Sequence, residues 1–230
     1  MVAVISVIVP TRNQKLFDTM VNSILRNIIK PDELIILDNT EDGGITVSDS
    51  LMLGMRVRLK RCSGLSVNHM WNAGISICPY RSEYDVICLL NDDIVLSPFY
   101  FDAAQALLSS HSTASTFIPK TSTKSVTDIQ INSIIGHGES SRAMRREGWA
   151  MAFRASVLKS ISQIPHDHIP TFCGDDWFWY HTHKEGYKWI TSSECLCYHV
   201  VSSTVRPLGY MKKLKTEKNE FVKIIQEGGC

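Results

Sequence analysis

Over the first 110 residues, apolar residues occur in short runs that alternate with segments of helical period. The short runs are rich in β-branched residues and are typical of buried strands. Between them, apolar residues recur at three- and four-residue spacing, which predicts amphipathic helices. Alternation of this kind predicts βαβ units with parallel strands, and therefore an α/β fold. Strands are predicted at 2–9, 33–39, 55–59 and 84–90, and helices at 16–28, 65–78 and 98–110.

Beyond residue 110 the alternation stops. Residues 111–147 are rich in Ser, Thr and Gly, which predicts a long loop or irregular hairpin of the kind that often covers a site. The lysine-rich segment from 208 to 226 predicts a surface helix, with a docking patch for an anionic acceptor as the alternative. Between these segments, strands are predicted at 148–154, 187–190 and 195–200, and helices at 155–161 and 177–185.

Composition narrows the class of protein. A formal net charge of +1 over 230 residues provides no general attraction to nucleic acid or to an anionic membrane. The apolar run at 2–9 is too short to span a bilayer and lacks a basic leader, so no transmembrane segment is expected. Seven cysteines without a CxxC pair argue against a disulfide framework or a zinc site and favour a reducing cytoplasm.

Polar residues follow three of the predicted strands at the point where each strand ends. These are Thr11 to Asn13, Asp38-Asn39 and Asn91-Asp92-Asp93. Ligands of open α/β sheets bind at the carboxyl ends of the strands. Carboxylate oxygens there suit Mg²⁺ or Mn²⁺ carrying a diphosphate. The alternative is a set of solvated acidic turns.

Together with later segments, these residues resemble the GT-A-type glycosyltransferases commonly called family 2. The resemblance implies a Rossmann-like, mostly parallel sheet with a smaller C-terminal acceptor-side portion. It also implies a nucleotide-sugar donor, a divalent metal and transfer with inversion. The expected domain is 1–205, with a nucleotide-sugar half (1–110), an acceptor half (111–205) and a basic helical tail (206–230). The matching segments are 7–13, 33–39, 72–74, 89–93, 148–154, 174–176 and His199.

For the donor, the resemblance implies that Asp38 accepts the imide N–H of a uracil and that Arg12 faces phosphate. The alternative for Asp38 is a turn-forming residue. The expected nucleotide-sugar-binding residues are Pro10, Thr11, Arg12, Asn13, Asp38, Asn39, Asn72, Asn91 and Asp92.

For the metal, Asn91-Asp92-Asp93 stands in the place of the family's Asp-x-Asp motif, with Asn at the first position. Asp93 is then the direct ligand, and Asn91 holds ribose or a metal-bound water. His199 matches a late histidine that completes the metal shell. Mixed oxygen and nitrogen ligands favour Mn²⁺ somewhat over Mg²⁺. The alternative for His199 is a histidine bonded to backbone at a strand end.

The reaction also needs a base for the acceptor hydroxyl, and Asp175 or Asp176 is the candidate. Both precede a predicted helix, whose amide dipoles favour an anion. The spacing to Gly186 favours Asp175 and the offset from Gly174 favours Asp176, with a slight preference for Asp176. The expected sugar- and acceptor-facing residues are Trp149 and Trp177, with core packing as the alternative for each.

The expected acceptor is a glycan or a lipid-linked saccharide. A hydroxylated nucleic-acid base is a second candidate, suggested by basic stretches at 142–146 and 212–218. A nucleotidyltransferase would need a Gly-rich phosphate loop after the first strand, and residues 10–13 contain no glycine. A non-catalytic nucleotide-sugar-binding module would need neither an aligned metal site nor a base.

Overall fold

The computed structural model describes residues 3–41, 44–49, 54–79, 82–122, 137–139, 148–200 and 209–228. Its strands are β1 (Ile5–Thr11), β2 (Glu33–Asp38), β3 (Arg56–Arg61), β4 (Val86–Leu90), β5 (Ile94–Leu96), β6 (Ala114–Ser122), β7 (His137–Glu139), β8 (Ala150–Arg154) and β9 (Lys188–His199). Its helices are α1 (Gln14–Leu25), α3 (Val67–Ile77), α4 (Tyr100–Ser110), α5 (Ala155–Ser160), α6 (Gly174–Lys184) and α7 (Tyr210–Gln226).

The described strands form one sheet in the order β3-β2-β1-β4-β8-β6-β9-β5, with β7 paired to β9. Strands β3, β2, β1 and β4 are parallel neighbours. Strand β8 runs antiparallel to both β4 and β6, and β9 runs parallel to β6. Most strands therefore share one direction, as the sequence predicts, and the sheet continues without interruption from the first half of the chain into the second.

The sheet must curl, because β4 and β5 are joined by only three residues. Three strands lie between β4 and β5, so a flat sheet would separate them by about 19 Å. The chain from Leu90 to Ile94 reaches at most about 14 Å. Consistent with curling, the Leu96 backbone N–H of β5 donates to Ser23 Oγ of α1 at 3.1 Å. The curl returns the end of the sheet to the region where β4 stops.

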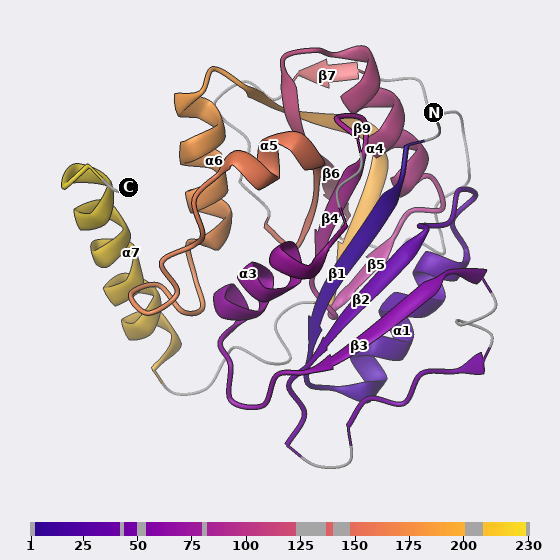
Figure 1. Cartoon of the computed structure of the whole chain (residues 1–230), viewed down its shortest axis with the longest axis horizontal. Helices are drawn as coiled ribbons and strands as arrows, with labels where there is room; N and C mark the ends of the chain where they lie inside the picture. Colours follow the sequence, from indigo (N-terminus) through magenta and orange to yellow (C-terminus); the bar gives the residue numbers. More distant parts are fainter. Residues whose placement is uncertain are drawn as a thin grey trace.

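Helices cover both faces of the sheet (Figure 1). Alternate side chains of the central strands divide between two buried clusters, as the two-residue period of a strand requires. Val7 and Val9 of β1 join the cluster that contains α1 and α4, whereas Ile8 joins the cluster around α3, α5 and α6. We call the second of these the α3-side cluster. Helix α7 lies beyond α6 at one end of the molecule, and its Phe221, Ile224 and Ile225 pack against that cluster.

The structure corrects the sequence-based prediction of the elements in three places. Ile94–Leu96, which lies in none of the predicted strands, forms β5 and pairs with β9. The segment predicted as loop from residue 111 begins with a strand, because Ala114, Phe117 and Ile118 are buried between β8 and β9. The strands predicted at 187–190 and 195–200 are one strand, β9. The rest of the long predicted loop, including the basic stretch 142–146 and apart from β7, lies outside the described residues.

Two composition-based expectations concern thiols and membranes. Six cysteines are free and buried, and Cys230 lies outside the described residues. None of the helices in the described part of the chain is long and apolar enough to cross a bilayer.

Close packing of α3 on β1 yields a test of the fold. A Cβ added at Gly74 would lie 2.4 Å from Ile8 Cγ2, a methyl group fixed in the buried centre of the sheet. We expect Gly74→Ala to lower the free energy of unfolding by roughly 1–3 kcal/mol despite the better helix propensity of Ala. Gly54→Ala is the control, since a Cβ there meets nothing within 4 Å. Equal stability of the two variants in urea unfolding would contradict this packing.

Candidate functional site

The ends of β1, β2 and β4 meet at one edge of the sheet. Thr11 pairs with Asp38 in the parallel register of β1 and β2, and the Asn39 backbone N–H donates to the Thr11 carbonyl at 2.7 Å. Thr11 Oγ1 also donates to Asp92 Oδ2 at 2.8 Å. The three polar segments that follow these strands in the sequence therefore form one site, as expected at the carboxyl ends of parallel strands.

The curl of the sheet brings Asp93 and His199 together from opposite parts of the chain. Asp93 immediately precedes β5, whose first residue, Ile94, pairs with His199 at the end of β9. The Val200 backbone N–H donates to the Asp93 carbonyl at 2.8 Å, which fixes the two segments to each other. As a result, His199 Nε2 lies 3.1 Å from Asp93 Oδ2, with only 7% of the Asp93 side chain exposed.

These two side chains fit a divalent cation. The second carboxylate oxygen of Asp93, Oδ1, is buried and has no hydrogen-bond partner among the described residues. An unpaired buried carboxylate oxygen is costly unless something else satisfies it. Carboxylate oxygen and imidazole nitrogen together suit Mn²⁺. The described residues contain no group of three or more such ligands, so a cation here would also need ligands from substrate or water.

Trp149 holds the imidazole from one side. Its ring stacks on that of His199 with centroids 4.5 Å apart and an interplanar angle of 8°. The position of Trp149 is fixed by the sheet, because its carbonyl accepts from the Asn91 backbone N–H at 2.9 Å. Trp149 thus connects the segment after β4 with the end of β9, and one of its faces is used by His199.

The first turn of α6 lies against Gly148, the residue next to Trp149. A Cβ added at Gly148 would lie 2.4 Å from Asp175 Cβ and 2.7 Å from Asp175 Oδ2, so the Asp175 side chain lies directly against this glycine. Gly148 adjoins Trp149, and Trp149 stacks on His199. Asp176 is half-buried in the same turn. Because successive helical residues point about 100° apart, the two carboxylates face different directions.

Asp38 is surrounded by donors from its own chain. Oδ1 accepts from Thr40 N at 2.9 Å and Thr40 Oγ1 at 2.7 Å, and Oδ2 accepts from Ile45 N at 3.0 Å and lies 3.2 Å from Arg61 Nη1. Burial alone would raise the pKa of Asp38, but the bonds from Thr40 and Ile45, together with Arg61, lower it. A carboxylate offers about four acceptor positions, and these contacts use them all. Uracil recognition by Asp38 would require one of them to open.

The remaining predicted donor residues mainly shape the edge of the site. Asn39 closes a loop by donating to the Leu65 carbonyl at 2.9 Å and accepting from Gly64 N at 2.8 Å. Asn13 caps α1 by accepting from Leu16 N at 3.1 Å. Next to it, Pro10 is buried in β1 and Arg12 is exposed at the strand end.

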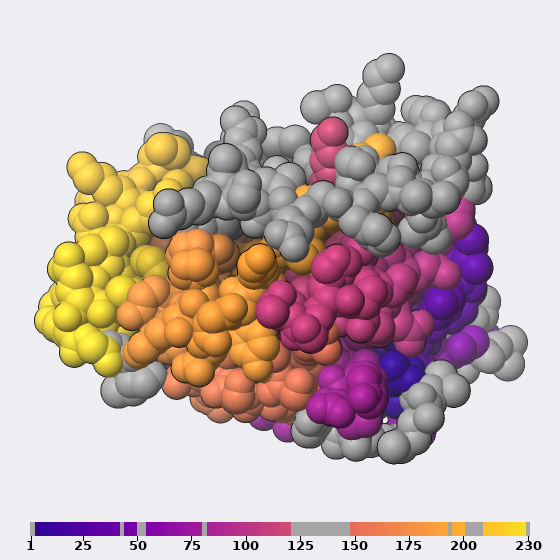
Figure 2. Space-filling view, turned by 90° about the horizontal axis from the view of Figure 1, so that it is seen from above, coloured from indigo at the N-terminus to yellow at the C-terminus, as the bar shows by residue number. Residues whose placement is uncertain are grey.

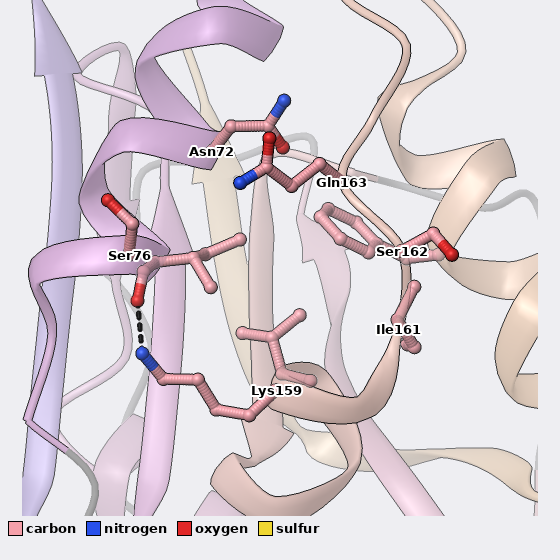
Figure 3. A pocket seen from close by; sticks show the side chains of 9 residues that line it. Asn72, Ser76, Lys159, Ile161, Ser162 and Gln163 are labelled. Atoms are coloured by element: carbon pink, nitrogen blue, oxygen red, sulfur yellow. Dashed lines mark hydrogen bonds between the residues drawn. The ribbon is translucent and has the colours of Figure 1, made fainter.

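Two predicted residues lie away from the strand-end site. Asn72 of α3 is buried and fastens the loop after α5, donating to the Ile164 carbonyl at 2.8 Å and accepting from Ile164 N at 3.0 Å. It lines a separate pocket with Gln163 and Lys159, whose ammonium group binds carbonyls at the end of α3 (Figure 3). Trp177 is 2% exposed in the α3-side cluster and donates to the Ser162 carbonyl at 2.9 Å, so it packs inside the protein.

Comparison with solved structures places this arrangement in a known fold. The mannosyltransferase PcManGT from Pyrobaculum calidifontis, in complex with GDP-Man and Mn²⁺, matches 96% of the chain with a TM-score of 0.67 and 16% identity. S. aureus TarS in complex with UDP matches 95% with a TM-score of 0.65 and 17% identity. GalNAc-T7 with UDP, GalNAc and Mn²⁺ matches 97% with a TM-score of 0.66 and 13% identity.

The chain has the GT-A fold. It spans 64%, 65% and 48% of the three chains, respectively. No protein-family model and no curated protein sequence matches it. The sequence-based prediction of a GT-A fold is thus confirmed through structure, at a level of identity where sequence comparison finds nothing.

Within this GT-A chain, Thr11, an expected nucleotide-sugar-binding residue, also ties β1 to Asp92 through its hydroxyl. Two further contributors had no role predicted from the sequence. Gly148 provides the space that Asp175 occupies. Glu217 of α7 is 3% exposed in a segment predicted to be a surface helix. A signal for Glu217 was present, because it stands three residues after Leu214 and four before Phe221, where a helix of this period buries apolar residues.

Asp92 yields a pH-dependent test of the site. Burial raises the pKa of Asp92 to about 6, with hydrogen bonds from Thr11 and Arg12 opposing the rise and Asp93 adding to it. An acid with a raised pKa in the folded state binds more protons folded than unfolded between about pH 4 and 6. Its contribution to stability is therefore lost as the pH rises through that window.

We expect Asp92→Asn to remove this dependence. With EDTA present, the variant should gain roughly 1–3 kcal/mol in unfolding free energy relative to the parent protein between about pH 4 and 7. Urea unfolding at several pH values measures the difference. A difference that stays constant with pH would show that Asp92 titrates normally.

Proposed function

We propose that this protein is a divalent-metal-dependent glycosyltransferase that moves a sugar from a nucleotide-sugar donor to an acceptor hydroxyl with inversion. The observation that carries the proposal is a continuous series of contacts on a GT-A fold. Asp93 contacts His199, His199 stacks on Trp149, and the neighbouring Gly148 supports Asp175. Two candidate cation ligands and a helix carrying two carboxylates thus meet at one edge of the sheet.

The donor would bind where β1, β2 and β4 end. Asn91, Asp92 and the exposed Arg12 border this edge, and a guanidinium there suits a diphosphate. The three similar structures contain GDP-Man in one case and UDP in the other two. A UDP-sugar is the donor we propose. Recognition of its uracil by Asp38 would require one of the hydrogen bonds to that carboxylate to open.

Asp93 and His199 would hold the metal, Mn²⁺ or Mg²⁺. Bound there, the ion would neutralise charge on the departing nucleoside diphosphate. Trp149 would keep the His199 ring in one orientation, so that Nε2 faces the carboxylate of Asp93. Outer groups that fix a ligating imidazole are a regular part of metal sites.

The carboxylate of Asp175 or Asp176 would act as the general base. It accepts the proton of the acceptor hydroxyl while that oxygen forms a bond to the anomeric carbon. The bond from the anomeric carbon to the phosphate oxygen breaks, and its electron pair leaves with the nucleoside diphosphate. The contact with Gly148 supports Asp175, and the offset from Gly174 supports Asp176.

For the acceptor we propose a glycan or a lipid-linked saccharide. A hydroxylated nucleic-acid base is the second candidate, supported by the exposed lysines of α7, including Lys212, Lys213, Lys215 and Lys218. Transfer to a nucleic-acid base would need that base to leave its stack, and binding of the nucleic acid would weaken steeply with salt. The buried free thiols support a reducing compartment such as the cytoplasm.

A donor panel tests catalysis and separates it from simple binding. Purified protein is incubated with UDP-, GDP-, CMP- and dTDP-sugars with and without Mn²⁺, and released nucleotide is measured. A transferase hydrolyses its donor slowly and only with the metal. A binding module would be stabilised by the donor, by about 2.7 kcal/mol at a hundredfold excess over its dissociation constant, yet release nothing.

Removal of a metal ligand should abolish metal-dependent turnover. We expect Asp93→Ala and His199→Ala each to lower the rate of nucleotide release from the donor about a hundredfold or more, because the leaving diphosphate loses its counter-ion. Calorimetric titration with Mn²⁺ in the presence of UDP should show the same loss in binding. Normal Mn²⁺ affinity in both variants would place the metal elsewhere.

The two candidate bases can be separated by neutral isosteres. Asp175→Asn and Asp176→Asn are compared, and the true base should lose roughly 10²- to 10⁴-fold in turnover at unchanged UDP affinity. Gly148→Ala serves as a geometric control, since its methyl group displaces Asp175 without removing any carboxylate. If Asp175 is the base, Gly148→Ala must also lower turnover. Full activity in both Asn variants would exclude this turn of α6 from the chemistry.

A further inference from the structure

The segment that leads into α6 is held by side chains from two other helices. From α3, Asn68 Nδ2 donates to the carbonyls of Ile169 and, at 3.0 Å, Phe172. From α7, Glu217 Oε2 accepts from two successive backbone N–H groups, Thr171 at 2.8 Å and Phe172 at 2.7 Å. The backbone from 169 to 172 is therefore bound on its carbonyl side by one helix and on its amide side by another.

The next residues show that this segment has little freedom. Cys173 is buried and adopts φ 61° and ψ 10°, the left-handed region that residues with a side chain rarely occupy. At Gly174, an added Cβ would lie 2.3 Å from Asn68 Oδ1. Such backbone persists only where the surroundings over-determine it. The two residues that follow Gly174 are Asp175 and Asp176, the candidate bases.

The placement of Glu217 is unusual for a carboxylate. It is 3% exposed on a helix whose Phe221, Ile224 and Ile225 pack on the α3-side cluster, while Phe172 meets Tyr210 of α7 edge to face at 5.2 Å. Its other oxygen, Oε1, lies 4.0 Å from Lys213 Nζ. Figure 2 shows α7 along the end of the molecule beside the α6 region. A buried carboxylate is costly, and the two amide hydrogen bonds to Oε2 offset part of that cost, while Oε1 is buried with no hydrogen-bond partner among the described residues.

We propose that Glu217 is a positioning residue for the catalytic carboxylate, fixing the strained turn before α6 so that Asp175 and Asp176 hold their places at the sheet edge. This role rests on the proposed function. It assigns α7 to the active site as an outer support, although α7 contributes no residue to the donor edge. Misplacing a catalytic group by about 1 Å can cost a hundredfold in rate, so a support of this kind matters to turnover more than to binding.

The test compares Glu217→Ala and Glu217→Gln with Glu220→Ala, which removes a half-buried glutamate from the same helix. We expect Glu217→Ala to lower kcat of donor turnover ten- to a hundredfold while the KM for donor and the calorimetric Kd for UDP with Mn²⁺ stay within about twofold. Glu217→Gln should keep kcat within about threefold, because an amide oxygen can still accept both N–H groups. Glu220→Ala should match the parent protein.

Wild-type kcat in Glu217→Ala would overturn the role. So would an equal loss of kcat and UDP affinity, or a Gln variant no better than the Ala variant, since these indicate a general loss of structure. If Glu217→Ala does not fold, Glu217→Asp replaces it: the shorter carboxylate should lower kcat while Gln preserves it, and the reverse order would overturn the role. Parent protein without donor turnover would instead contradict the proposed function itself.

Discussion

The pairing of β5 with β9 is the interaction on which the site depends. A connection of three residues between β4 and β5 forces the sheet to curl, and the curl sets Asp93 beside His199, 106 positions later in the chain. The same three residues carry the polar groups that face the ends of β1 and β2. One topological constraint therefore closes the sheet and assembles the candidate metal ligands. A change that opened the pairing of β5 with β9 would also separate Asp93 from His199.

Polar side chains in this protein divide between chemistry and support. Asp38 and Asn39 are engaged by their own chain at the donor edge, Asn13 Oδ1 caps α1, and Asn72 fastens a loop away from that edge. Asp93 keeps a buried oxygen without a partner among the described residues. An unpaired buried acceptor is costly, and at Asp93 it lies beside the His199 imidazole, where a cation would satisfy it.

The sequence was sufficient for the α/β alternation and the meeting of the strand ends, because these follow from hydrophobic period and from parallel pairing. The GT-A fold followed from the resemblance of its motifs to GT-A-type glycosyltransferases. It was not sufficient for β6, whose serines and threonines resemble a loop until burial between β8 and β9 makes them a strand. Nor could it show that Trp177 is buried or that Asp38 is saturated, since both depend on contacts between distant segments. Glu217 shows this limit most clearly. Its place among the apolar residues of α7 predicts a buried carboxylate, but it does not predict that the carboxylate binds the backbone N–H groups of Thr171 and Phe172.

Paramagnetic broadening by bound Mn²⁺ tests the central arrangement most directly. With UDP present, replacing Mg²⁺ by Mn²⁺ should erase the NMR signal of the Trp149 indole N–H, which stacks on His199, and the backbone amides of Asp175 and Asp176. The Trp189 indole serves as the internal reference, since Trp189 and Tyr198 pair with β6 residues six positions apart, which places Trp189 roughly 20 Å from His199. Loss of the Trp149 and α6 signals with Trp189 preserved is the predicted result. An unaffected Trp149 signal would contradict a metal site at Asp93 and His199.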